Sequence, residues 1–201
     1  LKFFNGRIIT QQRILNSGCV IIRDGKIIFA GSNNEEAPDA KLIDLKGKFL
    51  APGFIDIHVH GGGDHDFMDG TVDAICSDHT PEDIENKKKE FDYANFGMIG
   101  LETCFALANT ALSKNSKVDK EAVLERLILS LSDQPRAILS LPQPEIKTGV
   151  YANLTIFDPN QEWTVSNKHI KSKSMNTPLL GKNLKGKVVG VCHKDQWHVA
   201  Q

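Results

Sequence analysis

The first fifty residues alternate short apolar runs with turn-forming residues. Asp24–Gly25, between the apolar runs 19–23 and 26–30, is the strongest hairpin signal in the chain. Asn5–Gly6 predicts a second tight turn, and Lys41–Leu45 predicts a short strand. These patterns indicate a small antiparallel β-module at the amino-terminal end.

Strand patterns return towards the carboxy-terminal end. We expect strands over Ala152–Phe157, Trp163–Val165 and Lys187–Cys192, with turns at Asp158–Asn160 and Lys185–Gly186. Two β segments that cannot each close a core are expected to pair. The sequence therefore predicts one composite β-sandwich built from residues 1–51 and 145–201.

The middle of the chain has a different pattern. Phe54–His60 and Val72–Ser77 are almost wholly apolar, as are parallel strands buried on both faces. Helical spacing follows over Ile99–Leu112 and again after Asp119, a helix-capping residue. Ser132 or Asp133, ahead of Pro135, predicts the start of a third helix. The fold class is therefore α/β.

The length and the net charge limit which folds and which partners are expected. The chain has 201 residues, whereas a complete eight-stranded β/α barrel takes about 250. Its 24 basic and 25 acidic residues give a net charge of −1, which argues against a nucleic-acid or anionic-membrane partner. No apolar run is long enough to cross a bilayer. Four scattered cysteines predict reduced thiols and a cytoplasmic location. We expect a small-molecule substrate.

The first candidate site is a histidine pair. His58 and His60 are two residues apart on a predicted strand, so their side chains project from the same face. They stand at the strand's carboxyl end, where parallel α/β proteins place their sites. The pair predicts two metal ligands, and a purely structural pair is the alternative.

The second candidate site follows the next predicted strand. Asp78 could complete a Zn²⁺ or Mn²⁺ site or act as a general base, and the alternative is a turn cap. His79 is predicted to contact substrate or to finish the turn. The loop 64–66, an Asp-His-Asp run, is a further source of ligands or an ordinary polar loop.

The segment Pro52–His60 resembles the first barrel strand of the amidohydrolase superfamily, metal-dependent hydrolases that combine a β/α barrel with a β-sandwich made from both chain ends. Residues 1 to about 70, above all His60–Thr71, resemble N-acetylglucosamine-6-phosphate deacetylases. From about Asp69 onward the chain resembles dihydroorotases, and the motifs that carry this second resemblance are Ile75–Pro81, Phe96–Thr103 and Ser172–Pro178.

The resemblance implies specific roles. His58 and His60 would bind a divalent metal, zinc by preference and manganese as the alternative. Asp78 would be both ligand and catalytic base, and His79 would bind substrate. Residues 52–144 would be a truncated fragment of the hydrolase barrel, with its first and eighth strands and the helices that follow. The implied reaction is hydrolysis of a C–N bond, within pyrimidine biosynthesis for a dihydroorotase.

The chain also departs from the family pattern. Only about eleven residues separate His60 from Val72, where the family has six more βα units that carry a bridging lysine and two further histidine ligands. Gly61–Gly63 stands where dihydroorotases have a substrate-binding arginine. The chain looks like a join of two relatives with most of the barrel absent. A catalytically incomplete, metal-binding remnant is therefore the alternative to an active hydrolase, and association into a homo-oligomer stays open.

Overall fold

The computed structural model describes residues 1–11, 13–32, 35–57, 74–114 and 119–200. The chain divides into two compact units. Unit 1 comprises residues 1–55, 136–159 and 188–200, and unit 2 comprises residues 56–135 and 160–187. The predicted α/β class is confirmed, because the chain contains helices and a sheet of eight strands.

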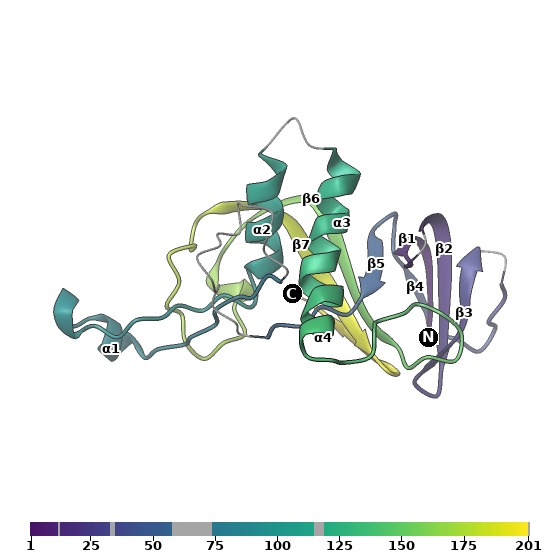
Figure 1. Ribbon diagram of the computed structural model, residues 1–201, viewed down its shortest axis with the longest axis horizontal. Helices are drawn as coiled ribbons and strands as arrows, with labels where there is room; N and C mark the ends of the chain where they lie inside the picture. The colour runs from purple at the N-terminus through teal and green to yellow at the C-terminus, as the bar shows by residue number, and fades with distance from the viewer. Residues whose placement is uncertain (12, 33–34, 58–73, 115–118, 201) are drawn as a thin grey trace. The chain divides into compact units, whose positions relative to one another are not determined.

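The sheet combines strands from both parts of the chain. Its strands are β1 (Lys2–Ile9), β2 (Ile14–Arg23), β3 (Lys26–Ser32), β4 (Leu42–Asp44), β5 (Phe49–Pro52), β6 (Asn153–Thr164), β7 (Asn183–His193) and β8 (Gln196–Val199). Their order is β3-β2-β1-β5-β6-β7-β8, with β4 paired to β1 (Figure 1). Strands from the first 52 residues therefore share one sheet with strands that follow residue 152.

The hairpin predicted at Asp24–Gly25 is confirmed. β2 and β3 pair antiparallel, with Arg23 opposite Lys26. Asp24 and Gly25 have φ values of 52° and 75°, as a two-residue type I′ turn requires. The strand predicted over 41–45 is present as β4, which pairs parallel to β1.

The turn predicted at Asn5–Gly6 is wrong, because β1 runs straight through these residues. They form a β-bulge instead: Asn5 has a φ of 54°, and the register with β2 shifts on either side of Gly6. The extra residue keeps Phe3, Gly6 and Ile8 on the buried face of the strand. An Asn-Gly pair satisfies a bulge as well as a turn, so the dipeptide alone could not distinguish them.

The core of unit 1 lies against this sheet. Phe3, Ile8, Val20 and Ile22 come from the amino-terminal strands, and Leu154 from β6 joins the same buried cluster. β5 links the two sets of strands, because it pairs parallel to β1 and antiparallel to β6. The shared core and shared sheet explain why neither β segment needs to close a core alone.

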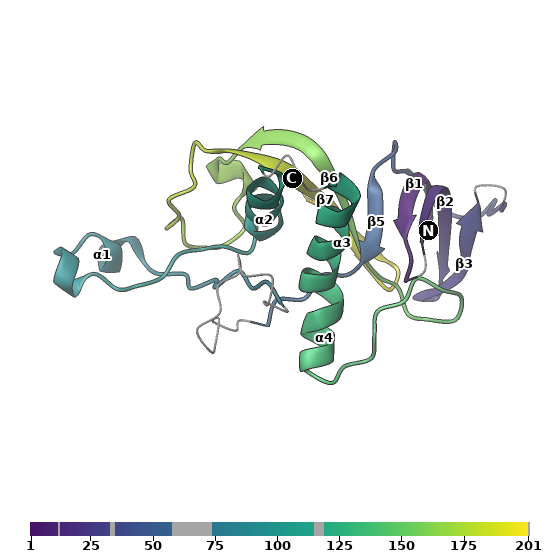
Figure 2. The same cartoon turned by 45° about the horizontal axis from the view of Figure 1, so that its top comes forward.

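Unit 2 contains most of the helices. They are α1 (Ile84–Lys87), the 3-10 helix η2 (Phe91–Tyr93), α2 (Cys104–Ser113), α3 (Lys120–Ile128), the π-helical segment η3 (Leu129–Asp133) and the 3-10 helix η4 (Asn167–His169). α2 and α3 lie side by side in both views (Figures 1 and 2). No helix in the described part of the chain is long and apolar enough to span a membrane.

The third helix does not start at Ser132 or Asp133, as the sequence had predicted. α3 continues through η3 directly into α4 (Gln134–Ile138). Pro135 lacks an N–H group and would clash with the carbonyl one turn earlier in a regular α-helix. The N–H of Gln134 reaches back to the carbonyl of Leu129, the wider π spacing, and the helix thereby accommodates the proline.

Two further predicted turns are wrong. Asp158–Asn160 lies within the continuous strand β6, and Lys185–Gly186 lies within β7. Gly186 has a φ of 96°, and the side-chain amide of Asn109 on α2 donates to the Lys185 carbonyl over 2.9 Å. The glycine permits this close approach of helix and strand, which local turn propensity does not reveal.

The two strands predicted to be buried on both faces are also wrong in their described parts. Residues 53–57 and 74–77 have no strand structure, and Phe54 and Ile75 are only half-buried. A strand of a parallel sheet is buried by neighbouring strands on its edges and by helices on its faces. β6 adjoins the start of the first segment, where the Gly53 N–H donates to the Asn153 carbonyl over 2.8 Å, but the described residues form no strand ladder along either segment. The apolar pattern is therefore present without the parallel sheet that it predicted.

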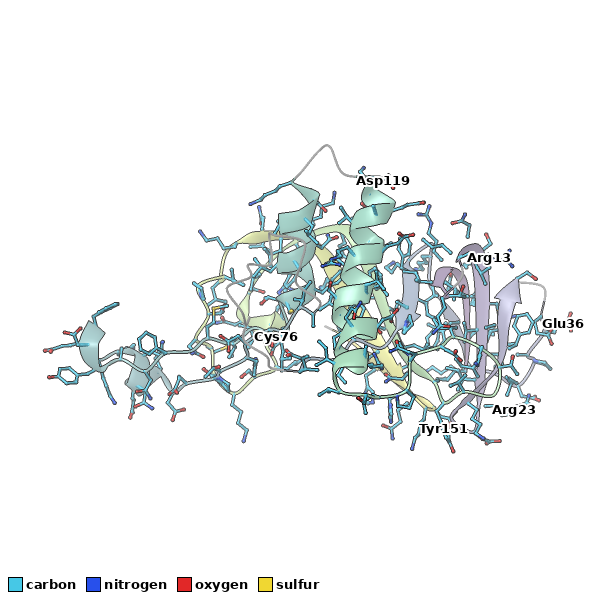
Figure 3. All side chains as sticks on the ribbon, viewed as in Figure 1. Arg13, Arg23, Glu36, Cys76, Asp119 and Tyr151 are labelled. Atoms are coloured by element: carbon cyan, nitrogen blue, oxygen red, sulfur yellow. The ribbon has the colours of Figure 1, made fainter. Side chains whose placement is uncertain are left out.

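The predicted helix cap at Asp119 is confirmed and gives a direct test (Figure 3). Its carboxylate accepts the backbone N–H of Ala122 over 3.3 Å. Asp119→Ala should lower the free energy of unfolding by about 1 kcal/mol in urea titrations, because that N–H group loses its partner. Glu125→Ala, at an exposed position of the same helix, is the control. Equal effects of the two substitutions would show that Asp119 does not cap the helix.

Candidate functional site

Asp78 lies on an exposed turn of unit 2. Its φ of 45° is in the left-handed region, which aspartate tolerates better than most residues. The hydroxyl of Thr80 lies 3.3 Å from the Asp78 carbonyl oxygen and 3.4 Å from its carboxylate. The turn therefore holds the carboxylate at the surface of the unit.

The ring of His79 is held by backbone groups. Its Nδ1 accepts the N–H groups of Gly100 over 3.2 Å and Leu101 over 3.3 Å. A neutral imidazole that accepts at Nδ1 carries its proton on Nε2. His79 also pairs with Met98 through an isolated parallel bridge, and the N–H of Thr80 donates to the Met98 carbonyl over 2.8 Å.

Two glycines allow these segments to approach each other. Gly97 has a φ of 121°, and a Cβ there would lie 2.7 Å from the Thr80 carbonyl oxygen. A Cβ on Gly100 would overlap the carbonyl of Ser77. Side chains at either position would force the segment 97–100 away from the turn that carries Asp78.

A third segment, distant in sequence, joins the first two. The carbonyl of Asn176 accepts the N–H of Ile99 over 3.0 Å, and its side-chain amide donates to the Gly97 carbonyl over 3.1 Å. The hydroxyl of Ser174 donates to the Glu82 carbonyl over 2.6 Å. Hydrogen bonds to Asn176 and Ser174 thus reach both of the other segments.

Glu102 ties the same loop to the start of α2. Its carboxylate accepts the backbone N–H groups of Lys171 and Ser172, each over 2.9 Å. Burial acts to raise the pKa of Glu102, but the backbone hydrogen bonds outweigh it and lower the pKa below the ordinary glutamate value. The carboxylate is therefore held in its ionised form.

Residues 78–82, 97–102 and 171–176 thus form one hydrogen-bonded group, which we call the three-segment cluster. Each segment lies largely within one of the three motifs that carry the dihydroorotase resemblance. Residues as many as 94 positions apart in the sequence are therefore brought together beside Asp78 and His79.

A surface depression of about 400 Å³ borders this cluster. It is lined by Pro81, Glu82, Asp83, Ser172, Lys173 and Ser174. Its volume is within the range of small-molecule sites. The depression has both acidic and basic side chains at its rim, so it is suited to a polar ligand.

The cysteines are thiols, as predicted: all four lie in the described residues and none forms a disulfide. Burial raises the pKa of Cys104 to about 12, with smaller contributions from Asp56 and Cys76. A thiol with so high a pKa stays protonated at neutral pH and is a poor nucleophile.

The carboxylate of Asp56 accepts hydrogen bonds from the backbone N–H and hydroxyl of Ser77.

The predicted metal ligands are described only in part. His58 and His60, together with the loop 64–66, lie outside the described residues. Within the described ranges, no group of three His, Cys, Asp or Glu side chains gathers as in a metal site. A catalytic zinc takes three protein ligands. The described residues, with Asp78 as their one predicted ligand, do not by themselves fit a metal centre.

Sequence reasoning missed Glu102 and Asn176 as members of the site. Both lie within motifs that carry the resemblance, but neither had been given a role. The bond from Lys171 to Glu102 spans 69 residues. No local pattern signals such a pairing, and only the motif boundaries pointed to these positions.

No protein-family model matches the chain. Several curated proteins do. The dihydroorotase of Chlorobaculum tepidum is 44% identical over 129 residues, which are 64% of this chain and 28% of that protein. The dihydroorotase of Elusimicrobium minutum is 42% identical over 118 residues, 59% of this chain and 26% of that protein. The predicted resemblance to dihydroorotases is confirmed. The chain spans about a quarter of the length of these relatives.

Solved structures share the fold. A D-hydantoinase (dihydropyrimidinase) from Thermus sp. aligns with a TM-score of 0.78 at 12% identity, covering 98% of this chain and 95% of that one. The dihydropyrimidinase from Brevibacillus agri gives a TM-score of 0.80 at 11% identity, covering 98% and 94%. The resemblance of residues 1–70 to N-acetylglucosamine-6-phosphate deacetylases stays a prediction.

The close approach at Gly97 predicts an unequal effect of two glycine substitutions. Gly97→Ala should lower the melting temperature more than Gly181→Ala, because a φ of 121° is less accessible to alanine than one of 77° and only the methyl at 97 meets a neighbour. The added overlap should cost about 1–3 kcal/mol beyond the cost of the backbone conformation. Differential scanning calorimetry measures both variants. Equal shifts would contradict the packing of residue 97 against Thr80.

Proposed function

We propose that this chain belongs to a metal-dependent cyclic amidohydrolase of the dihydroorotase type, which opens a ring by hydrolysing a C–N amide bond. The observation that carries the proposal is the three-segment cluster: the motifs shared with dihydroorotases meet at Asp78 and His79. Identities of 38–44% to dihydroorotases favour this activity over that of an amino-sugar phosphate deacetylase.

The proposal includes the architecture. Residues 1–51 and 145–201 would form a composite β-sandwich, and residues 52–144 a partial β/α barrel with its first and eighth strands. The sheet that joins β5 to β6 supports the first part. The structural likeness to hydantoinase chains supports an amidohydrolase fold.

The proposed site consists of His58, His60 and Asp78 as ligands of a divalent cation, with zinc preferred and manganese as the alternative. Such a cation supplies Lewis acidity for attack on an amide carbonyl. Asp78 would take the proton of the attacking water and pass it to the leaving nitrogen. Its exposed position in the turn suits this role.

His79 would bind the substrate through Nε2. Its Nδ1 is already engaged by the N–H groups of Gly100 and Leu101, so the ring presents an Nε2–H donor. A carbonyl or carboxylate oxygen of a small cyclic amide is the matching acceptor. A cytoplasmic location, a role in pyrimidine biosynthesis and a homo-oligomeric state are further parts of this proposal and rest on the resemblance.

Turnover and metal content test the function together. Purified protein supplied with Zn²⁺ or Mn²⁺ should hydrolyse dihydroorotate, and Asp78→Asn should reduce kcat by at least about a hundredfold, the usual range for loss of a general base. Asp92→Asn, at an exposed aspartate of the same unit that does not line the depression, should leave kcat unchanged.

The metal is measured separately by atomic emission after dialysis. Stoichiometric zinc should be lost in His58→Ala and His60→Ala. Turnover no higher than that of Asp78→Asn would overturn the enzymatic proposal and leave the catalytically incomplete remnant. Turnover of N-acetylglucosamine 6-phosphate alone would favour the deacetylase instead.

A further inference from the structure

The start of α2 lies at the centre of the three-segment cluster. Gly100 and Leu101 hold the His79 ring through their N–H groups, and the next residue is Glu102. The N–H groups of Thr103 and Cys104 both donate to the Gly100 carbonyl. The backbone is thus already turning into the helix at the point where it contacts His79.

α2 itself is firmly anchored in unit 2. The side-chain amide of Asn109 donates to the Lys185 carbonyl over 2.9 Å, and the Thr110 hydroxyl accepts the Lys185 N–H over 2.8 Å. Asn109 is buried, so its amide makes this bond away from solvent. Glu102, two residues before the helix begins at Cys104, therefore extends from a fixed support.

Glu102 extends from that support to the loop 171–176. A carboxylate that accepts two backbone N–H groups forms charge-assisted hydrogen bonds, about twice as strong as neutral ones. The loop held in this way carries Asn176, which binds both Gly97 and Ile99. The segment 97–99 is thus connected to α2 by the chain itself and by the loop.

We propose that Glu102 is a positioning residue for the Asp78–His79 turn. By fixing the loop 171–176 it keeps the segment 97–101 against the turn, where Met98 accepts the Thr80 N–H and the next residues hold the His79 ring. In this proposal Glu102 acts through the loop that it binds, and it is therefore a positioning residue and not a catalytic one. This inference rests on the proposed function only for its catalytic consequence, and its structural part is independent of it.

Amide hydrogen exchange followed by NMR tests the structural part. In Glu102→Ala, exchange at Thr80, Gly100 and Leu101 should become at least about tenfold faster, because loss of a charge-assisted hydrogen bond releases the loop and then the turn. Amides of β1 and β2 in unit 1 should keep their rates. Glu102→Gln retains an acceptor oxygen and should recover most of the protection, while Glu125→Ala should change nothing.

Each other result overturns the proposal. Faster exchange confined to Lys171 and Ser172 would show that Glu102 stabilises only the two residues to which it is hydrogen-bonded. Uniform acceleration throughout both units would make its role general stability. Failure of the glutamine variant to recover protection would show that the acceptor oxygen is not what positions the turn.

Activity separates this inference from the proposed function. If the wild-type chain hydrolyses dihydroorotate, kcat should fall at least tenfold in Glu102→Ala and recover in Glu102→Gln. Unchanged kcat in an active Glu102→Ala protein would overturn the positioning role. If the wild-type chain has no turnover, the proposed function fails, and the exchange pattern alone decides whether Glu102 positions the turn.

Discussion

The hydrogen bonds from the Gly100 and Leu101 N–H groups to the His79 ring are the constraint on which the candidate site depends. They fix a side chain, and not only a backbone, against the start of a helix. The two donors belong to consecutive residues and both bind the same ring nitrogen, Nδ1. This contact fixes the His79 ring beside Asp78.

The contact is possible because glycines stand at positions 97 and 100, where a side chain would overlap the neighbouring segment. Gly97 approaches Thr80, and Gly100 approaches Ser77. The cost is the positive φ of Asp78, a sparsely populated conformation for a residue that has a side chain. Such conformations persist where surrounding interactions over-determine them. The bonds from Asn176, Ser174 and Glu102 supply those interactions.

Local chemistry in the sequence predicted part of this fold. Asp24–Gly25 and the Asp119 cap each depend on neighbours a few residues away, and both were predicted correctly. The bulge at Asn5–Gly6 and the continuous strand β6 depend on partners far along the chain. Their turn-forming residues therefore led to wrong predictions of turns. The apolar segments 54–57 and 74–77 have a strand's composition but form no strand pairing within the described part of the chain.

The candidate site, like the fold, could be predicted from the sequence only in part. Asp78 and His79 were identified from residue type and position, and the resemblance named the motifs around them. Glu102 and Asn176 act through backbone groups that any residue carries, so no pattern in the sequence marks their partners. The histidine pair at 58 and 60 lies outside the described residues, and its role stays a prediction.

Because residues 78–82, 97–102 and 171–176 form one hydrogen-bonded group, they should open as one unit. Native-state amide exchange of the wild-type chain measures the free energy of opening at Thr80, Ile99, Gly100 and Ser172. It is followed as denaturant is raised in steps below the unfolding transition. These amides, which come from all three segments, should converge on a single free energy of opening. Exchange of the Ser172 amide at the rate of an unstructured peptide, with Thr80 and Gly100 still protected, would contradict the account.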